Sequence, residues 1–312
     1  MRSITHFQSG FAPKRRKSSY RSTELEVRRA CLSVKRFGME VNMKILAIDS
    51  SGLVAGVAVA EGDTLLAEYT TNYKKTHSQT LLPMLDEVKR MIELDLSSID
   101  AIAVAAGPGS FTGLRIGSAT AKGLGLALDK PLIGVPTVDA LAMNLYGAGG
   151  YICPIMDARR NQVYTGIYAF VPEKGEADVG MEQTYRLQIV RPQYVAPIEE
   201  VADTLNHLPE KKDVIFLGDG VPVFHDRLKE LMKRPFICAP ASCNRQRAAA
   251  VAVLAQRYAQ EGRMENARDH APEYLRPSQA ERTRREKAAT AGGQKQNVQE
   301  QNGQEPGSHV DH

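Results

Sequence analysis

Two aspartates at the ends of apolar runs are the first candidates for chemistry in this 312-residue chain. Asp49 follows the apolar run 45–48, and Asp157 follows the run 151–156. Two carboxylates on facing turns, with a cleft between them, would suit the binding of a phosphate through Mg²⁺. Aspartate also caps its own turn in many proteins, and the sequence leaves both roles open.

Glycine-rich turns provide a second set of candidates, because glycine lets a backbone come close to a phosphate. Gly107 and Gly109 are followed by Gly113, which gives G-x-G-x-x-x-G, one residue longer than the dinucleotide-binding fingerprint. No P-loop of the form G-x-x-x-x-G-K-[ST] occurs in the sequence. The candidates for nucleotide binding or turn formation are Asp49, Ser50, Gly107, Gly109, Asp157, Gly218 and Gly220.

Metal-binding and nucleophile motifs are missing from the sequence. The seven histidines form no H-E-x-x-H or H-x-x-x-H pair on a predicted helix, and no serine stands in a G-x-S-x-G elbow. We therefore predict no catalytic residue, no metal site and no cofactor of its own. The four cysteines form no C-x-x-C pair, which favours reduced thiols and a cytoplasmic location. No apolar run reaches the ~18 residues of a membrane span, so no membrane association is predicted.

A helix predicted from about Leu114 has an unusual surface. Gly117, Ala121 and Gly125 lie four residues apart and therefore share one face. Glycines inside a helix cost roughly 1 kcal/mol each relative to alanine, which is tolerated where another backbone comes very close. That neighbour is either a second chain or the protein's own sheet, and the residues alone leave both open.

The elements around this helix predict an α/β protein of two lobes. Three short strands over 44–71 form an antiparallel meander, and an amphipathic helix follows over 77–93. A strand over 151–157 again ends in an aspartate and is followed by a return strand, so the second half opens as the first does. The chain length and this weak repeat both favour two lobes.

Charge divides the chain into three parts. Residues 1–42 hold ten Lys or Arg and three Glu, whereas residues 43–281 hold 25 basic and 29 acidic residues. A domain that binds nucleic acid alone is usually strongly basic, so the central part is not expected to do so. We predict a disordered leader over 1–42 and a disordered tail over 282–312. A basic arm that binds nucleic acid is the alternative for the leader.

Several motifs together resemble the TsaB (YeaZ) family over residues 43–282. The most specific of them is G-P-G-S-F-T-G-L-R-I-G at 107–117. The others are M-K-I-L-A-I-D-S-S (43–51), T-H-S-Q-T-L-L-P (76–83), A-K-G-L (121–124), D-A-R-R-x-x-V-Y (157–164), P-E-Y-L-R (272–276) and Q-A-E-R (279–282).

The resemblance implies a fold of two RNase H-like lobes, as in actin and Hsp70 (the ASKHA fold), which we place at 43–148 and 149–281. It also implies a non-catalytic subunit that activates TsaD, a related transferase. TsaD forms N6-threonylcarbamoyladenosine at adenosine 37 of tRNAs that read codons beginning with A. The implied partners are TsaD in a heterodimer, the ATPase TsaE, and tRNA through the complex. A homodimer is implied in isolation, and any nucleotide is expected at the complex interface.

In this family the helices that begin near His77 and Leu114 form the docking surface. The implied interface residues are His77, Leu81, Leu82, Leu85, Leu114, Arg115, Gly117, Ser118, Ala121, Lys122 and Gly125. Two alternative functions remain. One is an ASKHA-type ATP-dependent phosphotransferase that uses Asp49 and Asp157. The other is a metalloprotease-like protein, which the missing metal motif disfavours.

Overall fold

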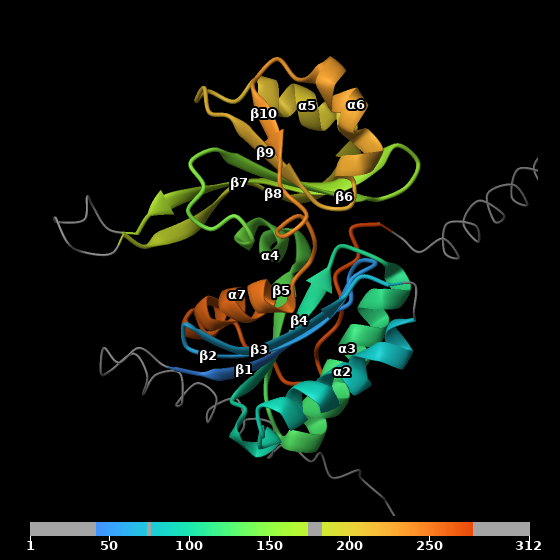
Figure 1. The fold of residues 1–312 in the computed structure, drawn as a ribbon, viewed down its shortest axis with the longest axis vertical. Coiled ribbons are helices and arrows are strands. Elements are labelled where there is room, and N and C mark those ends of the chain that lie inside the picture. The colour runs from blue at the N-terminus through green and yellow to red at the C-terminus, as the bar shows by residue number, and fades with distance from the viewer. Residues whose placement is uncertain (1–41, 74–75, 174–182, 277–312) are drawn as a thin grey trace, which may run out of the picture.

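The structure of this chain, a computed structural model, describes residues 42–73, 76–173 and 183–276. The predicted tail, 282–312, lies outside the described residues, as does all of the predicted leader except residue 42. The described chain forms two lobes that are stacked along the long axis of the molecule (Figure 1).

The first lobe is built on a five-stranded mixed sheet. Its strands are β1 (Lys44–Asp49), β2 (Ala55–Glu61), β3 (Thr64–Thr71), β4 (Ala101–Gly107) and β5 (Leu132–Pro136). They lie in the order β3-β2-β1-β4-β5, in which β2 is antiparallel to β1 and β3, and β4 is parallel to β1 and β5. Helices cover both faces of this sheet, which explains why β1 and β4 are almost continuously apolar and buried.

The second lobe repeats this arrangement strand for strand. Its strands are β6 (Tyr151–Asp157), β7 (Gln162–Pro172), β8 (Tyr185–Pro197), β9 (Val214–Leu217) and β10 (Phe236–Cys238). Read from β8, the order is β8-β7-β6-β9-β10, with the same strand directions as in the first sheet. The predicted repeat and the predicted two-lobed α/β fold are confirmed.

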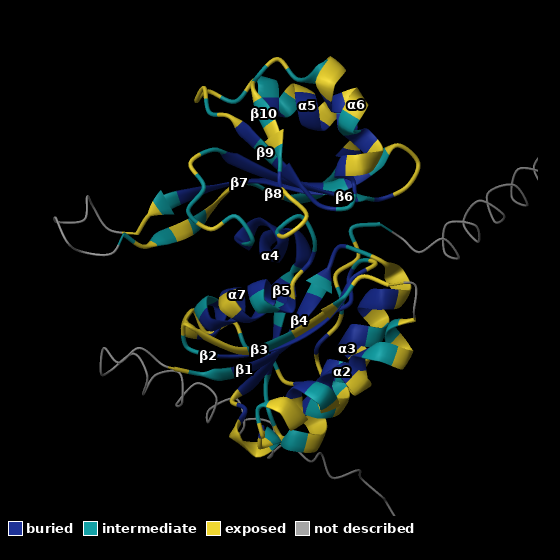
Figure 2. Ribbon diagram, viewed as in Figure 1, coloured by how far each residue is buried: buried dark blue, intermediate teal, exposed yellow. Residues whose placement is uncertain are grey.

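Helices and sheets alternate in five layers (Figure 1). The helices are α2 (His77–Met91), α3 (Phe111–Leu128), α4 (Thr137–Met143), α5 (Ile198–Asn206), α6 (Val221–Leu231), α7 (Ala248–Gln260) and the short 3₁₀ helix η1 (Leu96–Ser98). α2 and α3 cover the outer face of the first sheet, α4 and α7 lie between the sheets, and α5 and α6 cover the second sheet. The central apolar cluster contains side chains of both lobes, so the lobes share one core (Figure 2). Within the described residues, no helix has the length and apolarity needed to cross a membrane.

α3 begins three residues before its predicted start at Leu114. Its first residue is Phe111, and the Ser110 side chain caps it by accepting a hydrogen bond from the Gly113 amide at 3.3 Å. A serine in this position satisfies one of the amides that the first helical turn leaves unpaired. The G-P-G-S-F-T-G motif is therefore a strand end, a capped turn and the first turn of a helix.

Local sequence also explains two elements of the second lobe. α6 begins at Val221, because Pro222 suits the first turn of a helix. β8 pairs with β7 along most of its length.

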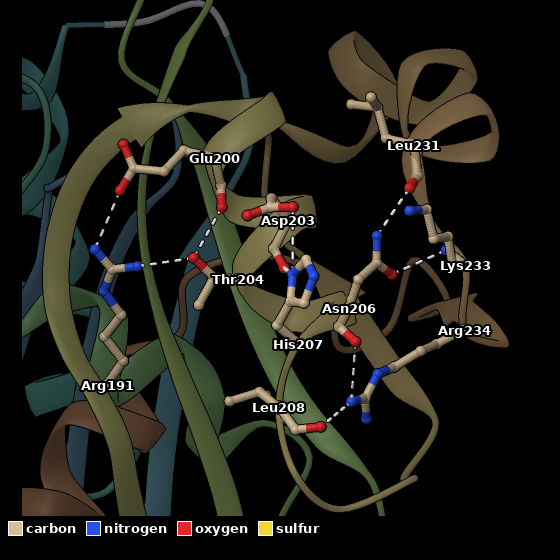
Figure 3. A network of polar contacts seen from close by, with 10 residues as sticks. All are labelled: Arg191, Glu200, Asp203, Thr204, Asn206, His207, Leu208, Leu231, Lys233 and Arg234. Carbon is tan, nitrogen blue, oxygen red and sulfur yellow. Dashed lines mark hydrogen bonds and ion pairs between the residues drawn. The ribbon is translucent and has the colours of Figure 1, made fainter.

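Polar contacts fix α5 between β8 and the end of α6 (Figure 3). Arg191 on β8 donates to Glu200 of α5 at 3.2 Å. At the C-terminal end of α5, Asn206 donates to the Leu231 carbonyl at 3.0 Å, and Arg234 donates to the Asn206 carbonyl at 3.3 Å. The last carbonyls of a helix lack partners within the helix, so Asn206 completes the end of α6 and Arg234 completes the end of α5.

A buried aspartate connects the two lobes. Asp139 on α4 accepts hydrogen bonds from the hydroxyl of Tyr168 on β7 at 2.6 Å and from that of Tyr258 on α7 at 3.2 Å. Burial raises the pKa of Asp139, and the two hydroxyl donors oppose this effect. One side chain thus ties the second sheet to the helices that lie on the first.

Candidate functional site

The small-residue face of α3 is buried inside the first lobe. Gly117 and Gly125 are buried, and Ala121 has no exposed surface. A Cβ at Gly117 would collide with the Ser50 hydroxyl, and one at Gly125 would lie 2.8 Å from the Ala267 Cβ. The close neighbour of these three residues is the protein's own chain. Packing inside the chain thus accounts for this face, and a partner contact of these residues stays a prediction.

The leucines of the implied interface are mostly buried as well. Leu81 and Leu85 of α2 and Leu114 of α3 are buried against the first lobe. An amphipathic helix turns its apolar side towards its own sheet. The helical spacing of these leucines therefore reflects the packing of the helices on the first sheet. A partner contact of these three leucines likewise stays a prediction.

Ser118 and Lys122 face the C-terminal segment 263–276, which we call the strap. Ser118 Oγ lies 3.1 Å from Nε2 of His270, and Nδ1 of His270 lies 2.7 Å from Oε1 of Glu265. Lys122 Nζ donates to the His270 carbonyl oxygen at 2.8 Å. These contacts hold the strap along α3, so Ser118 and Lys122 position the chain's own C-terminal segment. A partner contact of Ser118 and Lys122 stays a prediction.

The Ser118–His270–Glu265 chain has the residue types of a hydrolase triad. Ser118 is only 4% exposed and His270 only 2%. Neither residue lines the cavity between the lobes, so that cavity does not bring a substrate to the hydroxyl. We assign these three hydrogen-bonded side chains a structural role.

The exposed sides of α2 and α3 remain available and form what we call the outer face (Figure 2). Its residues point away from the sheet and are Gln79, Leu82, Pro83, Asp86 and Arg90 on α2 and Thr112, Arg115, Ala119, Gly123 and Leu126 on α3. Leu82 and Leu126 are 56% and 52% exposed, and a Cβ added at Gly123 would meet nothing within 4 Å. Of the implied interface residues, Leu82 and Arg115 lie on this face.

A cavity of about 440 Å³ lies between the two lobes. Its lining includes residues 51–53, His77, 108–111, 157–160, Asp219 and 273–276. Five of the motifs that carry the resemblance therefore meet in one place, although they are up to about 200 residues apart in the chain. His77, implied as an interface residue, lies in this lining at the start of α2.

The two candidate acids do not form a pair across this cavity. Asp49 is buried, and its Oδ1 accepts hydrogen bonds from the amide and the hydroxyl of Ser51 at 2.9 and 2.6 Å. Burial raises the pKa of Asp49, against the lowering effect of Ser51. Asp157 does line the cavity, but its oxygens accept from the amide and the guanidinium of Arg159 at 2.7 and 3.2 Å. Each aspartate caps its own turn, the alternative that the sequence left open.

The candidate glycines bring the chain close to itself. A Cβ added to each would meet a carbonyl oxygen, that of Glu273 for Gly107, of Ser51 for Gly109, and of Ile155 for Gly218 and Gly220. Gly107 and Gly218 also have φ values of +120° and +109°, which residues other than glycine rarely adopt. Ser50 is likewise engaged, since its hydroxyl donates to the Gly113 carbonyl at 2.9 Å. The glycine turns therefore leave no backbone cradle for a phosphate.

These contacts do not fit the Mg²⁺-bound nucleotide that an ASKHA fold implies. Asp49, the expected metal ligand, is enclosed by its own turn. Across residues 42–73, 76–173 and 183–276, no three His, Cys, Asp or Glu side chains are placed to hold a metal ion together. The phosphotransferase alternative thus loses the residues on which it depended.

The strap joins the two lobes beside the cavity. The Glu273 amide donates to the Ala106 carbonyl of the first lobe at 2.7 Å, and its carboxylate accepts from Gln193 of β8 at 3.0 Å. Arg276 donates to the Ala158 carbonyl of the second lobe at 2.8 Å. The sequence marks P-E-Y-L-R as a motif but does not indicate this role, because the residues it joins are more than 70 positions away.

Comparison with known proteins agrees with the fold and with the motifs. A family model described as "TsaD: tRNA N6-adenosine threonylcarbamoyltransferase" matches residues 64–284. The "tRNA threonylcarbamoyladenosine biosynthesis protein TsaB" of Bacillus subtilis (strain 168) is 34% identical over 240 residues, which are 77% of this chain and 96% of that protein. The protein of the same name from Haemophilus influenzae is 34% identical over 170 residues, which are 53% of this chain and 69% of that protein.

A solved structure shows the same relationship. The structure titled "YeaZ from Pseudomonas aeruginosa" is 28% identical, superposes with a TM-score of 0.60, and is matched over 75% of this chain and 100% of its own. The sequence, the motifs and the fold agree, and the chain belongs to the TsaB (YeaZ) family.

Proposed function

We propose that this chain is a non-catalytic subunit that activates TsaD in the formation of N6-threonylcarbamoyladenosine on tRNA. It would dock TsaD through the outer face of α2 and α3. The observation that carries the proposal is the exposure of two leucines, Leu82 and Leu126, and of the small residues Ala119 and Gly123 on the outer face. A partner helix that covers these side chains would remove their apolar surface from water.

The match to a TsaD family model supports docking between like elements. A related chain would carry a corresponding helix pair, and two such pairs can form a four-helix contact. Ala119 and Gly123 lack bulk on the outer face, so a partner helix could approach the α3 backbone closely there. The same face would serve a homodimer when TsaD is absent.

The non-catalytic role is supported by the burial and the hydrogen bonds of the candidate reactive groups. Asp49 caps its own turn, and Ser118 is closed off beneath the strap. The acidic balance of residues 43–281 supports leaving most tRNA contacts to other subunits. We place TsaE and tRNA at the assembled complex, any nucleotide of the transfer reaction at its interface, and the complex in the cytoplasm.

The proposal predicts that Leu82→Arg and Gly123→Leu abolish co-purification with the cognate TsaD. A charge in an apolar contact, or a large side chain between two close helices, should weaken binding by about tenfold or more. Val223→Arg is the matched control, because Val223 is also exposed and apolar but lies on α6 of the second lobe.

A second measurement connects docking to function. Cells that express TsaD, TsaE and this chain are assayed for the modified nucleoside in bulk tRNA. Leu82→Arg should lower its amount while Val223→Arg leaves it unchanged. Normal co-purification of both outer-face variants would reject the docking face, and normal modification without this chain would reject the activating role.

A further inference from the structure

Apolar side chains gather at the opening of the cavity between the lobes. Leu53, Phe111 and Tyr274 line this cavity and are 72%, 38% and 40% exposed, so they lie where it meets the solvent. The ring centres of Phe111 and Tyr274 are 4.8 Å apart. The Ser110 amide donates to the Ser51 carbonyl at 2.7 Å, which holds the turn that carries Leu53 beside the start of α3. Three separate segments of the chain therefore present exposed apolar surface at one place.

The second lobe adds an arginine to this opening. Arg160 lines the cavity and is exposed, and its side chain forms no ion pair or hydrogen bond within the described chain. Its φ is +56°, and its neighbours Arg159 and Asn161 have φ values of +64° and +57°. Residues other than glycine adopt this left-handed conformation at a cost in free energy, and such positions cluster at functional sites. We call Arg160 and the three apolar side chains the rim.

The rim continues the outer face of α2 and α3. Phe111 is the first residue of α3 and precedes Thr112, which belongs to the outer face. The guanidinium of Arg115, also on the outer face, lies 5.5 Å from the centre of the Phe111 ring. Arg115 is exposed and has no ion pair with any residue that the structure describes. A protein that covers the N-terminal half of α3 would therefore meet the rim next.

We propose that TsaD, docked on the outer face, also covers the rim, with an apolar side chain against Phe111 and Tyr274 and a carboxylate paired with Arg160. This contact rests on the docking proposed above and extends it to the second lobe. Aromatic residues and arginine are enriched in protein interfaces, because rings bury large apolar areas and a guanidinium can donate two parallel hydrogen bonds to a carboxylate. The rim draws on both lobes and the strap, so one partner would hold all three together.

Aromatic rings and arginines also suit single-stranded RNA, but two features of the rim favour a protein. Leu53, its most exposed apolar residue, offers no ring on which a base could stack. Glu273 is exposed next to Tyr274 on the strap, and residues 43–281 hold 29 acidic against 25 basic residues. Such a balance disfavours a phosphate backbone. The rim therefore fits a protein surface with apolar and acidic side chains.

Calorimetric titration of the full chain with the cognate TsaD tests the rim. Arg160→Asn and Leu53→Ser should each weaken binding by about tenfold, and Arg160→Asn should also flatten the dependence of Kd on salt. Asparagine tolerates a positive φ and Leu53 is mostly exposed, so both variants should keep their thermal midpoints. Arg186→Asn and Ile237→Ser are the matched controls, because both change exposed residues of the second lobe outside the cavity.

The outer-face variant Leu82→Arg separates the rim from the docking itself. Loss of binding in Leu82→Arg, with unchanged binding in both rim variants, would overturn the rim contact and leave the docking face in place. Unchanged binding in Leu82→Arg would overturn the docking face, and the rim contact with it. Equal weakening by the controls would overturn the rim contact. So would an Arg160→Asn effect confined to the affinity of the assembled complex for tRNA, which would make the rim an RNA contact.

Discussion

Gly117 and Gly123 lie on the same helix but face opposite surroundings. A Cβ at Gly117 would collide with Ser50, whose hydroxyl is held by the Gly113 carbonyl, whereas a Cβ at Gly123 meets nothing within 4 Å. At the residue scale, one glycine is required by packing inside the lobe. The other is a surface position where, within this chain by itself, glycine weakens the helix.

This contrast predicts opposite effects of one substitution. Gly117→Ala should lower the free energy of unfolding by about 1–3 kcal/mol, because the added methyl group overpacks the contact with Ser50. Gly123→Ala should raise it by about 0.5–1 kcal/mol, because alanine is the better helix former. Urea unfolding followed by circular dichroism measures both. If both substitutions changed the free energy of unfolding in the same direction, the assignment of the Gly117 side of α3 as the face buried against the first sheet would be wrong.

At the scale of elements, the strap decides how the two lobes meet. It contacts the first lobe through the Glu273 amide and through Tyr274, whose ring lies 4.8 Å from that of Phe111. It contacts the second lobe through Gln193 and through Arg276. Residues 273–276 carry all of these contacts, so they should matter out of proportion to their number.

Two truncations separated by four residues test the strap. Ending the chain after Pro272 removes these contacts and should lower the free energy of unfolding by about 2–4 kcal/mol, since each hydrogen bond contributes about 1 kcal/mol. Ending it after Arg276 keeps the contacts and should leave stability unchanged. Thermal unfolding of the two chains gives the comparison, and identical midpoints would show that the strap does not hold the lobes.

At the scale of the whole molecule, Asp139 makes the joint between the lobes sensitive to pH. Its pKa in the folded chain is raised by burial above the unfolded value of about 3.9. The stability that it contributes is therefore fully present below that value and falls as pH rises through the folded pKa. The hydroxyls of Tyr168 and Tyr258 limit this loss, because they donate to the charged form.

Removing one donor should widen this pH dependence. Tyr168→Phe should lower the free energy of unfolding at neutral pH by about 1–3 kcal/mol, and by less at acidic pH, where Asp139 is protonated. Asp139→Asn should flatten the pH dependence, because an amide does not titrate. Urea unfolding at several pH values reports both effects. A Tyr168→Phe deficit that is constant across pH would exclude Asp139 as its cause.

Much of the architecture could be predicted from local sequence. The antiparallel meander over 44–71 matches β1, β2 and β3, and the aspartate that ends each opening strand correctly marked a repeat. Strand alternation, helical period and turn residues act over short distances, so they can be identified without the rest of the chain. The family followed from motifs such as G-P-G-S-F-T-G-L-R-I-G for the same reason.

The candidate site was less predictable. The small-residue spacing on α3 correctly indicated a very close neighbour but not which one, since the protein's own chain and a partner place the same demand on Gly117 and Ala121. Leu53, Arg160 and Tyr274 carried no signal as single residues. Only the quoted motifs D-A-R-R and P-E-Y-L-R could have drawn attention to Arg160 and Tyr274.

By itself, the sequence determined the elements of this protein, its two-lobed α/β class and its membership of the TsaB family, because these depend on periodicity and on contiguous motifs. The tertiary structure alone decided which side of α3 is covered and which remains open. It also decided that residues near 77, 110, 158 and 275 enclose one cavity. The physical reason is that burial and charge pairing are set by neighbours distant in the chain, which no local pattern specifies.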